Sequence, residues 1–179
     1  MEKTLRGNSR TRGPVVHVTL ARGMGWGLIG GLAGTMVMDL VLMGVLSAAG
    51  LPAFTCFSII GTTVARFFSI LGIEMAGGVP TGAAAHYLIG PLVGAIFGAA
   101  VARIETLRPD TLKKSMLLAI LYVEILSRPI LATAPFLLTM TVPQAMQWFG
   151  GAFGMHLICG VVLGAVVSYG LRSASSRPA

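Results

Sequence analysis

Four long apolar runs constrain the fold of this chain more than any other feature of its sequence. They cover residues 24–46, 80–102, 114–138 and 148–170, so each is 23 to 25 residues long. A helix of about 20 apolar residues crosses the hydrocarbon core of a bilayer. Only 11% of the 179 residues are charged and 55% are hydrophobic, which excludes an ordinary soluble domain. The sequence predicts an all-α integral membrane protein whose membrane domain, residues 24–170, is a bundle of four transmembrane helices.

The positions of the basic residues predict the orientation of these helices. Eleven of the thirteen Lys and Arg residues fall in three hydrophilic segments: the N-terminal arm 1–23, the loop 103–114 and the C-terminal tail 171–179. Lys and Arg in short loops are retained on the cytoplasmic side of a membrane. We therefore expect both termini to be cytoplasmic. The net charge of +7 follows from this topology, and the basic segments lack the interleaved aromatic residues of a nucleic-acid site.

A fifth apolar stretch, residues 52–72, contains a single charged residue, which is Arg66. If this stretch crossed the membrane, the basic loop 103–114 would lie outside. We therefore expect it to begin and end on the outer side, as an interfacial or re-entrant helix that follows a sharp turn near Gly50.

The second and fourth apolar runs share the pattern His-x3-Gly-x3-Gly. It occurs as His86, Gly90 and Gly94 in one run and as His156, Gly160 and Gly164 in the other. Both runs cross from outside to inside in the expected topology. The repeat predicts a duplicated helical hairpin whose copies are related by an axis along the membrane normal, and it makes Asp39 equivalent to Arg128.

Glycine residues four positions apart predict how the helices pack. Small residues at this spacing let helix backbones approach closely in lipid, where a hydrophobic driving force between helices is missing. We expect contacts within the chain, rather than a dedicated dimer face, at Gly30, Gly34, Gly90, Gly94, Gly160 and Gly164.

Ionisable residues inside the apolar runs are the candidate functional residues, because such groups are expensive in lipid and usually face one another. Glu124 and Arg128 stand four residues apart, which favours a pair on one helix. Asp39 needs a partner on another helix, for which Arg128 is the first choice and Arg66 the second. These four residues form the expected intramembrane polar cluster.

The two membrane histidines, His86 and His156, lie with Asp39 at about 9–12 Å below the outer ends of their runs, at a rise of about 1.5 Å per residue. We expect each imidazole to make an interhelical hydrogen bond. Two histidines at one depth are also compatible with axial ligation of haem b, with a quinone site or with proton transfer. Cys56 and Cys159 are too few for a four-ligand zinc site, and neither a metal site nor a catalytic residue is predicted.

Several short patterns resemble one known family. They are the glycine-rich first run ending before Leu51-Pro52, the amphipathic stretch after it, Gly82-Ala83-Ala84-Ala85-His86 with Gly90, and His156 with Gly160 and Leu163-Gly164. In these the chain resembles the YagU-like family of small uncharacterised bacterial inner-membrane proteins. The resemblance implies a multi-span membrane protein without an assigned enzymatic activity.

The sequence thus predicts a non-enzymatic accessory or structural subunit of a membrane assembly. Its partners would be the lipid bilayer and other membrane-protein subunits or a second copy of itself. One alternative is an electron-transfer subunit linked to haem b or quinone through His86 and His156. A second alternative is a small transporter or proton pathway through Asp39, Arg128 and the histidines.

Overall fold

A computed structural model describes residues 19–173, and all regular secondary structure in this range is helical. The elements are α1 (Leu20–Ala48), α2 (Thr55–Ile70), α3 (Val79–Arg103), the short 3₁₀ helix η1 (Glu105–Leu107), α4 (Leu112–Leu137) and α5 (Val142–Arg172). By length and composition, α1, α3, α4 and α5 could each cross a membrane. The basic residues of segment 1–18 and Arg177 lie outside the described residues. Four long apolar helices and one shorter helix confirm the predicted all-helical fold.

Threonine residues define where three of the long helices begin. Thr19 and Thr111 accept hydrogen bonds from the backbone N–H groups of Arg22 and Lys114, respectively. Thr141 forms a capping box with Gln144 at the start of α5. That helix begins at Val142, six residues before the predicted run 148–170. The prediction is too short because Gln144 and Gln147 make this first part of the helix less apolar.

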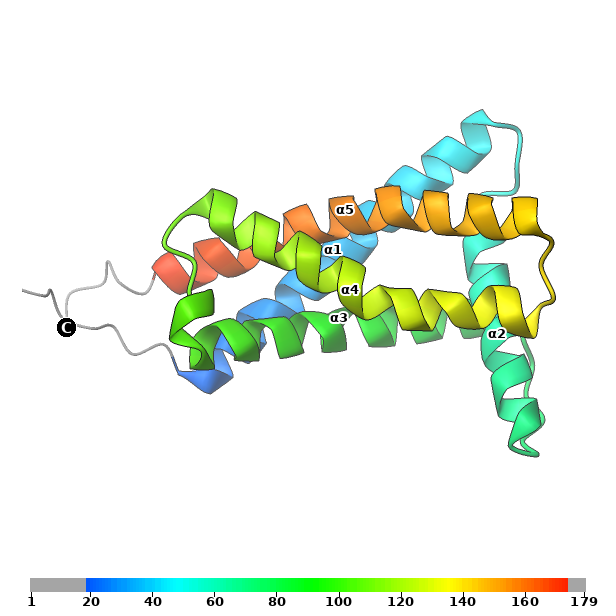
Figure 1. Ribbon diagram of the computed structural model, residues 1–179, viewed down its shortest axis with the longest axis horizontal. Coiled ribbons are helices and arrows are strands. Elements are labelled where there is room, and N and C mark those ends of the chain that lie inside the picture. Colours follow the sequence, from blue (N-terminus) through cyan, green and yellow to red (C-terminus); the bar gives the residue numbers. More distant parts are fainter. Residues whose placement is uncertain (1–18, 174–179) are drawn as a thin grey trace, which may run out of the picture.

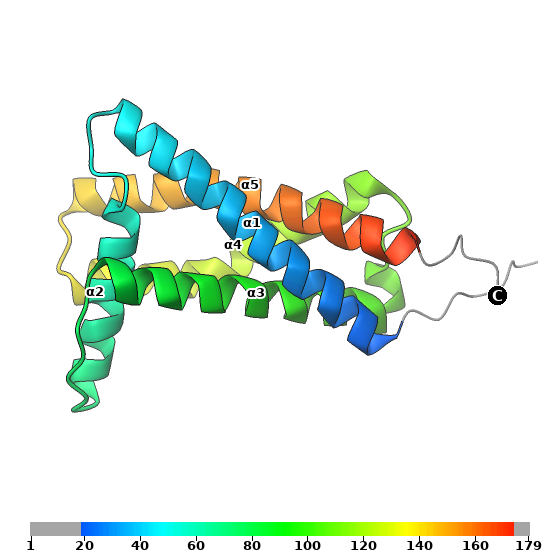
Figure 2. The same cartoon turned by 180° about the vertical axis from the view of Figure 1, so that it is seen from behind.

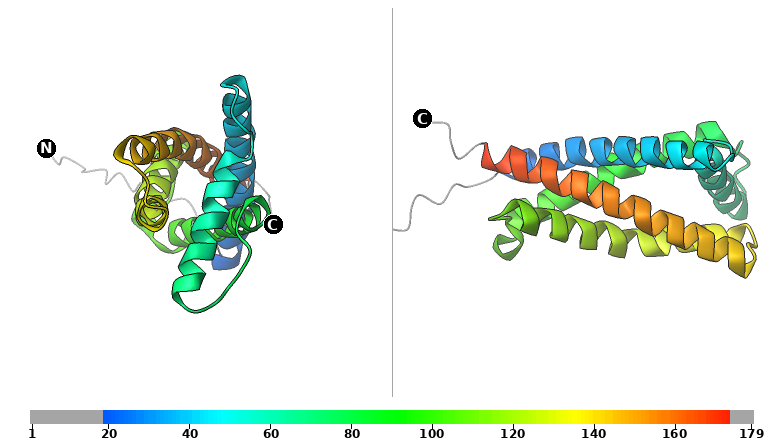
Figure 3. Two further views of the ribbon diagram at one scale, coloured as in Figure 1. Left: turned by 90° about the vertical axis from the view of Figure 1, so that its right-hand side faces the viewer. Right: turned by 90° about the horizontal axis from the view of Figure 1, so that it is seen from above.

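The four long helices lie side by side, and α2 lies across one end of them (Figures 1 and 2). We call this end the α2 end, and the opposite end, where α1 begins and α5 finishes, the terminal end. Helix α1 crosses diagonally between α3 and α5, and α4 packs on α5. The two connections of α2 and the α4–α5 loop all lie at the α2 end, as the view along the bundle also shows (Figure 3). Helix α2 therefore begins and finishes at the same end, after a turn in which Gly50 has a φ of 72°.

The half of the bundle nearer the terminal end has a solid core. Its buried residues are Phe97, Val101, Ala119, Val123, Leu163, Val167 and Leu171. Two interhelical hydrogen bonds brace this core: Tyr122 Oη donates to the Val93 carbonyl at 3.0 Å, and Ser115 Oγ donates to the Gly164 carbonyl at 2.7 Å. This half holds the helices together at fixed positions.

Helices α1 and α3 approach so closely that side chains would not fit between them. A Cβ atom added at Gly31 would lie 3.0 Å from Gly94 Cα, and one added at Gly27 would lie 3.0 Å from Gly98 Cα. A neighbouring face of α1 approaches α5 in the same way, since a Cβ atom at Gly34 would lie 2.9 Å from the Cys159 carbonyl oxygen. Helix α1 is therefore in close backbone contact with both α3 and α5.

Glycine also sets the contact between α4 and α5. Cβ atoms added at Gly160 and Gly164 would each lie 2.6 Å from an α4 backbone atom, Ile120 Cα and Met116 Cα, respectively. All six glycines that the sequence assigns to helix packing therefore lie at contacts between helices of this chain, with Gly30 and Gly90 next to Leu163 and Thr35.

The contact between α1 and α3 predicts opposite effects for two neighbouring substitutions. Gly27→Ala should lower the free energy of unfolding by about 1–3 kcal/mol, because the added methyl group meets the α3 backbone. Gly25→Ala is the matched control, since a Cβ atom there has nothing within 4 Å. Its effect should be neutral or stabilising by up to about 1 kcal/mol, from better helix propensity. Denaturant unfolding in detergent micelles measures both, and equal losses would contradict the proposed close approach.

Candidate functional site

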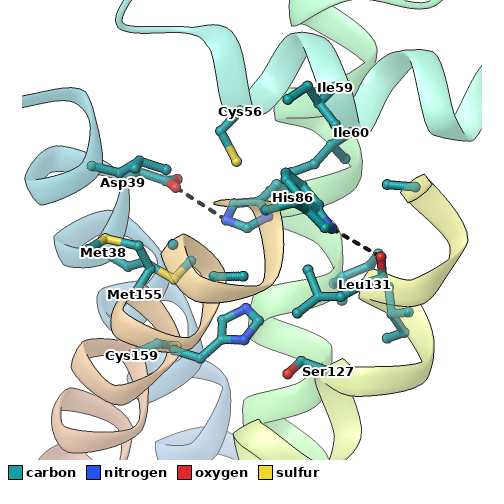
Figure 4. Close-up of a pocket in the computed structure, with 18 of the residues that line it drawn as sticks. Met38, Asp39, Cys56, Ile59, Ile60, His86, Ser127, Leu131, Met155 and Cys159 are labelled. Atoms are coloured by element: carbon teal, nitrogen blue, oxygen red, sulfur yellow. Dashed lines mark hydrogen bonds and ion pairs between the residues drawn. The ribbon is translucent and has the colours of Figure 1, made fainter. Parts of the chain in front are cut away.

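A cavity of about 800 Å³ lies in the half of the bundle nearer the α2 end (Figure 4). All five α-helices contribute to its wall, and most of the lining side chains are apolar, among them Met38, Leu42, Ile59, Ile60, Leu131 and Met155. Pockets for small molecules typically measure about 300–1,000 Å³ and combine an apolar wall with a few polar groups. In size and lining this cavity is suited to a small, largely apolar molecule.

The main polar feature of the cavity is a contact between Asp39 of α1 and His86 of α3. His86 Nε2 lies 3.2 Å from Asp39 Oδ1, which is an ion-pair distance, and Figure 4 shows the two side chains pointing toward one another. Asp39 is only 3% exposed. The contact is not aligned as a hydrogen bond. His86 Nε2 and the second carboxylate oxygen, Asp39 Oδ2, make no hydrogen bond with residues 19–173, although the Tyr87 hydroxyl group of α3 is near enough to interact with Asp39.

This partner differs from the expected one. Arg128 hydrogen-bonds Glu124 on its own helix and lies over the Phe153 ring, with its guanidinium carbon 5.4 Å from the ring centroid. Neither residue of this pair lines the cavity. Arg66 is exposed on α2. The predicted pairing of Asp39 with Arg128 or Arg66 is therefore wrong, whereas the predicted Glu124–Arg128 pair is present.

The register of α1 and α3 explains why Asp39 meets His86. The helices are antiparallel, and matched residues recur at every fourth position: Gly27 with Gly98, Gly31 with Gly94, Thr35 with Gly90, and then Asp39 with His86. One helical turn separates each pair from the next. The four-residue spacing of these residues is present in the sequence. If the two helices are paired antiparallel at that spacing, His86 is the residue opposite Asp39.

The second hairpin has an equivalent register. Gly164 faces Met116 and Gly160 faces Ile120. One further turn along each helix leads to His156 on α5 and Glu124 on α4. His156 Nδ1 and Glu124 Oε1 are both buried and, within the described part of the chain, have no hydrogen-bond partner.

His156 lines the same cavity as His86, from α5. The structure thus brings both sequence-predicted histidines to one site together with Asp39, and leaves Glu124, Arg128 and Arg66 outside it. Two free thiols, Cys56 of α2 and Cys159 of α5, also line the cavity. The sequence predicts no role for these thiols, because a lone cysteine in an apolar helix has no characteristic spacing. The described residues contain no group of three or more His, Cys, Asp or Glu side chains placed to hold a metal ion.

Helix α2 forms part of the cavity wall at its own end of the bundle. Its backbone approaches α3 closely, since a Cβ atom added at Gly61 would lie 2.7 Å from Gly82 N. The Phe57 ring packs edge-on against the His86 ring, with 5.9 Å between centroids. Figure 4 shows the Cys56 side chain pointing from α2 toward the Asp39–His86 contact. Helix α2 therefore both lines the cavity and packs against one side of His86.

Comparisons of this chain with protein-family models, with curated proteins and with solved structures find no match.

The contact between Asp39 and His86 predicts coupled effects on stability. In a double-mutant cycle of Asp39→Asn and His86→Gln, we compare the loss of unfolding free energy in the double mutant with the sum of the two single losses. The two values should differ by about 0.5–3 kcal/mol, as is typical of residues in contact. A second cycle that combines Asp39→Asn with Arg128→Gln should be additive within about 0.5 kcal/mol, because the two residues have different partners. Unfolding in micelles measures both cycles. Coupling in the second cycle and additivity in the first would restore the Asp39–Arg128 pair.

Proposed function

We propose that α1, α3, α4 and α5 cross the inner membrane of a bacterium, with both termini in the cytoplasm and α2 on the outer side. The exterior of the bundle supports this, because large apolar side chains are exposed on all four helices, for example Leu40, Leu88, Ile125, Phe136 and Met146, which are 67–81% exposed. A soluble monomer rarely exposes so much apolar surface. Arg22, Arg103, Arg108, Lys113, Lys114 and Arg172 all lie toward the terminal end, as cytoplasmic retention of basic residues requires.

This topology predicts the side from which single cysteines are labelled. In a variant with Cys56 and Cys159 replaced by alanine, Met75→Cys in the α2–α3 connection should react with an impermeant maleimide added to the outside of intact cells. Thr106→Cys in η1 should react only after the membrane is opened. Labelling of both cysteines from the same side would contradict four crossings.

We infer that the membrane bundle arose by duplication of a helical hairpin, α1 with α3 and α4 with α5. The two glycine registers support this inference, because each leads one turn further to an acidic residue facing a histidine position: Asp39 with His86, and Glu124 with His156. Glu124, rather than Arg128, then stands at the position equivalent to Asp39. The resemblance to the YagU-like family agrees with such a bundle.

We propose that the protein is a non-enzymatic membrane accessory protein that binds a lipid-soluble small molecule in the cavity. The observation that carries this proposal is an unpartnered, buried carboxylate oxygen, Asp39 Oδ2, in the wall of a large apolar cavity. Leaving a buried polar group without a hydrogen bond costs about 1–3 kcal/mol, and more if it is charged. A molecule with an apolar body and a polar end would remove this cost and fill the cavity.

Axial ligation of haem b fits these residues less well. Ligation of iron requires both imidazoles to turn a nitrogen toward the metal. His86 turns Nε2 toward a buried carboxylate on another helix and its ring is packed against Phe57, so only Nδ1 could face an iron, and a haem plane would have to fit beside that ring. The reduced, phenolic form of a quinone-type molecule needs no rearrangement of this pair and remains within the proposed ligand class.

Trp148 lines the cavity and can report occupancy by its fluorescence. The chain has two tryptophans, so Trp26→Phe leaves Trp148 as the only one. We expect bromododecane, an apolar heavy-atom quencher, to quench Trp148 saturably in lipid nanodiscs.

A matched pair of glycine substitutions tests whether this quenching reports the cavity. Gly151→Phe should weaken binding at least tenfold, because Gly151 lines the cavity and a side chain there enters open space. Gly154→Phe is the control on the same helix, since Gly154 also has open space but does not line the cavity. Quenching that is linear in bromododecane, or equal effects of both substitutions, would contradict ligand binding in the cavity.

A further inference from the structure

The chemistry of the polar groups at the Asp39–His86 contact restricts which ligand the cavity can accept. Two atoms there lack hydrogen-bond partners within residues 19–173: Asp39 Oδ2 and His86 Nε2. They belong to side chains that approach within 3.2 Å, from His86 Nε2 to Asp39 Oδ1, so a single small group can lie beside both. This inference rests on the proposed function, because it specifies the ligand of the same cavity.

The carboxylate oxygen requires a hydrogen-bond donor. An ionised carboxylate only accepts hydrogen bonds, so a ketone, ether or ester oxygen cannot satisfy Asp39 Oδ2. A ligand carboxylate or phosphate would place a second negative charge beside a residue that is only 3% exposed, where repulsion is poorly screened. These classes of polar headgroup are therefore disfavoured.

The imidazole restricts the headgroup further. His86 Nε2 faces Asp39, so its N–H donates into the same space when the nitrogen is protonated. A ligand ammonium group would satisfy Asp39, but it has no lone pair to accept from His86 and would meet a like charge whenever His86 is charged. A hydroxyl group has one O–H donor and two lone pairs, so it can donate to the carboxylate and accept from the imidazole at once.

The rest of the cavity determines the body of the ligand. Beyond the polar contact the wall consists mainly of aliphatic and sulfur-containing side chains, such as Leu42, Ile60, Leu131 and Met155. Such a wall favours a hydrocarbon chain or ring system without further polar groups.

We propose that the cavity binds a lipophilic alcohol or phenol, with its hydroxyl group between Asp39 and His86 and its hydrocarbon part along the apolar wall. The hydroxyl donates to Asp39 Oδ2 and accepts from His86 Nε2. This class includes membrane-soluble alcohols and the reduced, phenolic form of quinone-type molecules.

The test compares a brominated alcohol with its methyl ether, which differ only in the hydroxyl proton and a methyl cap. Bromododecanol and its methyl ether are titrated against the Trp26→Phe protein in nanodiscs, with saturable quenching of Trp148 as the readout. A hydrogen bond to a charged group is typically worth a factor of about ten to a hundred in affinity. We expect the alcohol to bind at least tenfold more tightly than the ether.

Two substitutions connect this preference to Asp39. Asp39→Leu should reduce the alcohol-to-ether affinity ratio to about one. Asp39→Asn keeps the side-chain shape and should reduce the ratio severalfold, so it serves as the test if the leucine variant does not fold. Glu124→Gln is the matched control, because Glu124 is another buried carboxylate with an unpartnered oxygen but does not line the cavity. Its ratio should equal that of the parent protein.

The outcomes separate this inference from the proposed function. Equal saturable binding of alcohol and ether would overturn the hydroxyl site and leave the cavity as a ligand site. Tighter binding of bromododecylamine than of the alcohol would also overturn it, in favour of a cationic headgroup. If neither probe quenches Trp148 saturably, the ligand-binding function itself fails.

Discussion

The rest of this structure depends on the close approach of α1 to both of its neighbours. In lipid, helices gain little by hiding apolar surface from one another, so van der Waals contact between backbones must hold them together. Glycines on one face of α1 contact α3 and those on a neighbouring face contact α5, as Gly31 and Gly34 illustrate. Helix α4 packs mainly on α5 and contacts α3 over a much smaller area, where Tyr122 meets Val93 and Phe97. In the half of the bundle nearer the α2 end, α3 and α4 leave a space between them, and this space is the cavity.

The bundle has a packed half and a half that contains the cavity, and this division suggests why Asp39 is buried where it is. A buried ion pair is a poor way to gain stability, because desolvation of the two charges offsets most of their attraction. The packed half already contains fully buried apolar side chains such as Leu163 and Val167, and so does not need the Asp39–His86 contact to hold the helices. A carboxylate kept at 3% exposure with one oxygen unpartnered is therefore better explained by what binds next to it than by folding.

Much of the fold, but only part of the site, follows from the sequence. Hydropathy is sufficient for the four long helices, and the positions of the basic residues are sufficient to bring both ends of α2 to one end of the bundle. The partner of Asp39 was predicted wrongly, because depth in a membrane was used where helix register was needed. The ladder from Gly27 to Asp39 on α1, opposite Gly98 to His86 on α3, contained that register. The cavity has no such signal, since it depends on which helices fail to meet.

The two proposed hairpin copies differ in where their carboxylates lie. In the first copy the acidic residue, Asp39, lines the cavity and faces the histidine of the neighbouring helix. In the second copy Glu124 pairs with Arg128, one turn further along α4, and neither residue lines the cavity. His156 lies in the cavity wall without a hydrogen-bond partner for Nδ1 in the described part of the chain. Asp39 is thus the only carboxylate among the described residues that lines the cavity, so the proposed hydroxyl group can donate to a carboxylate at one position only.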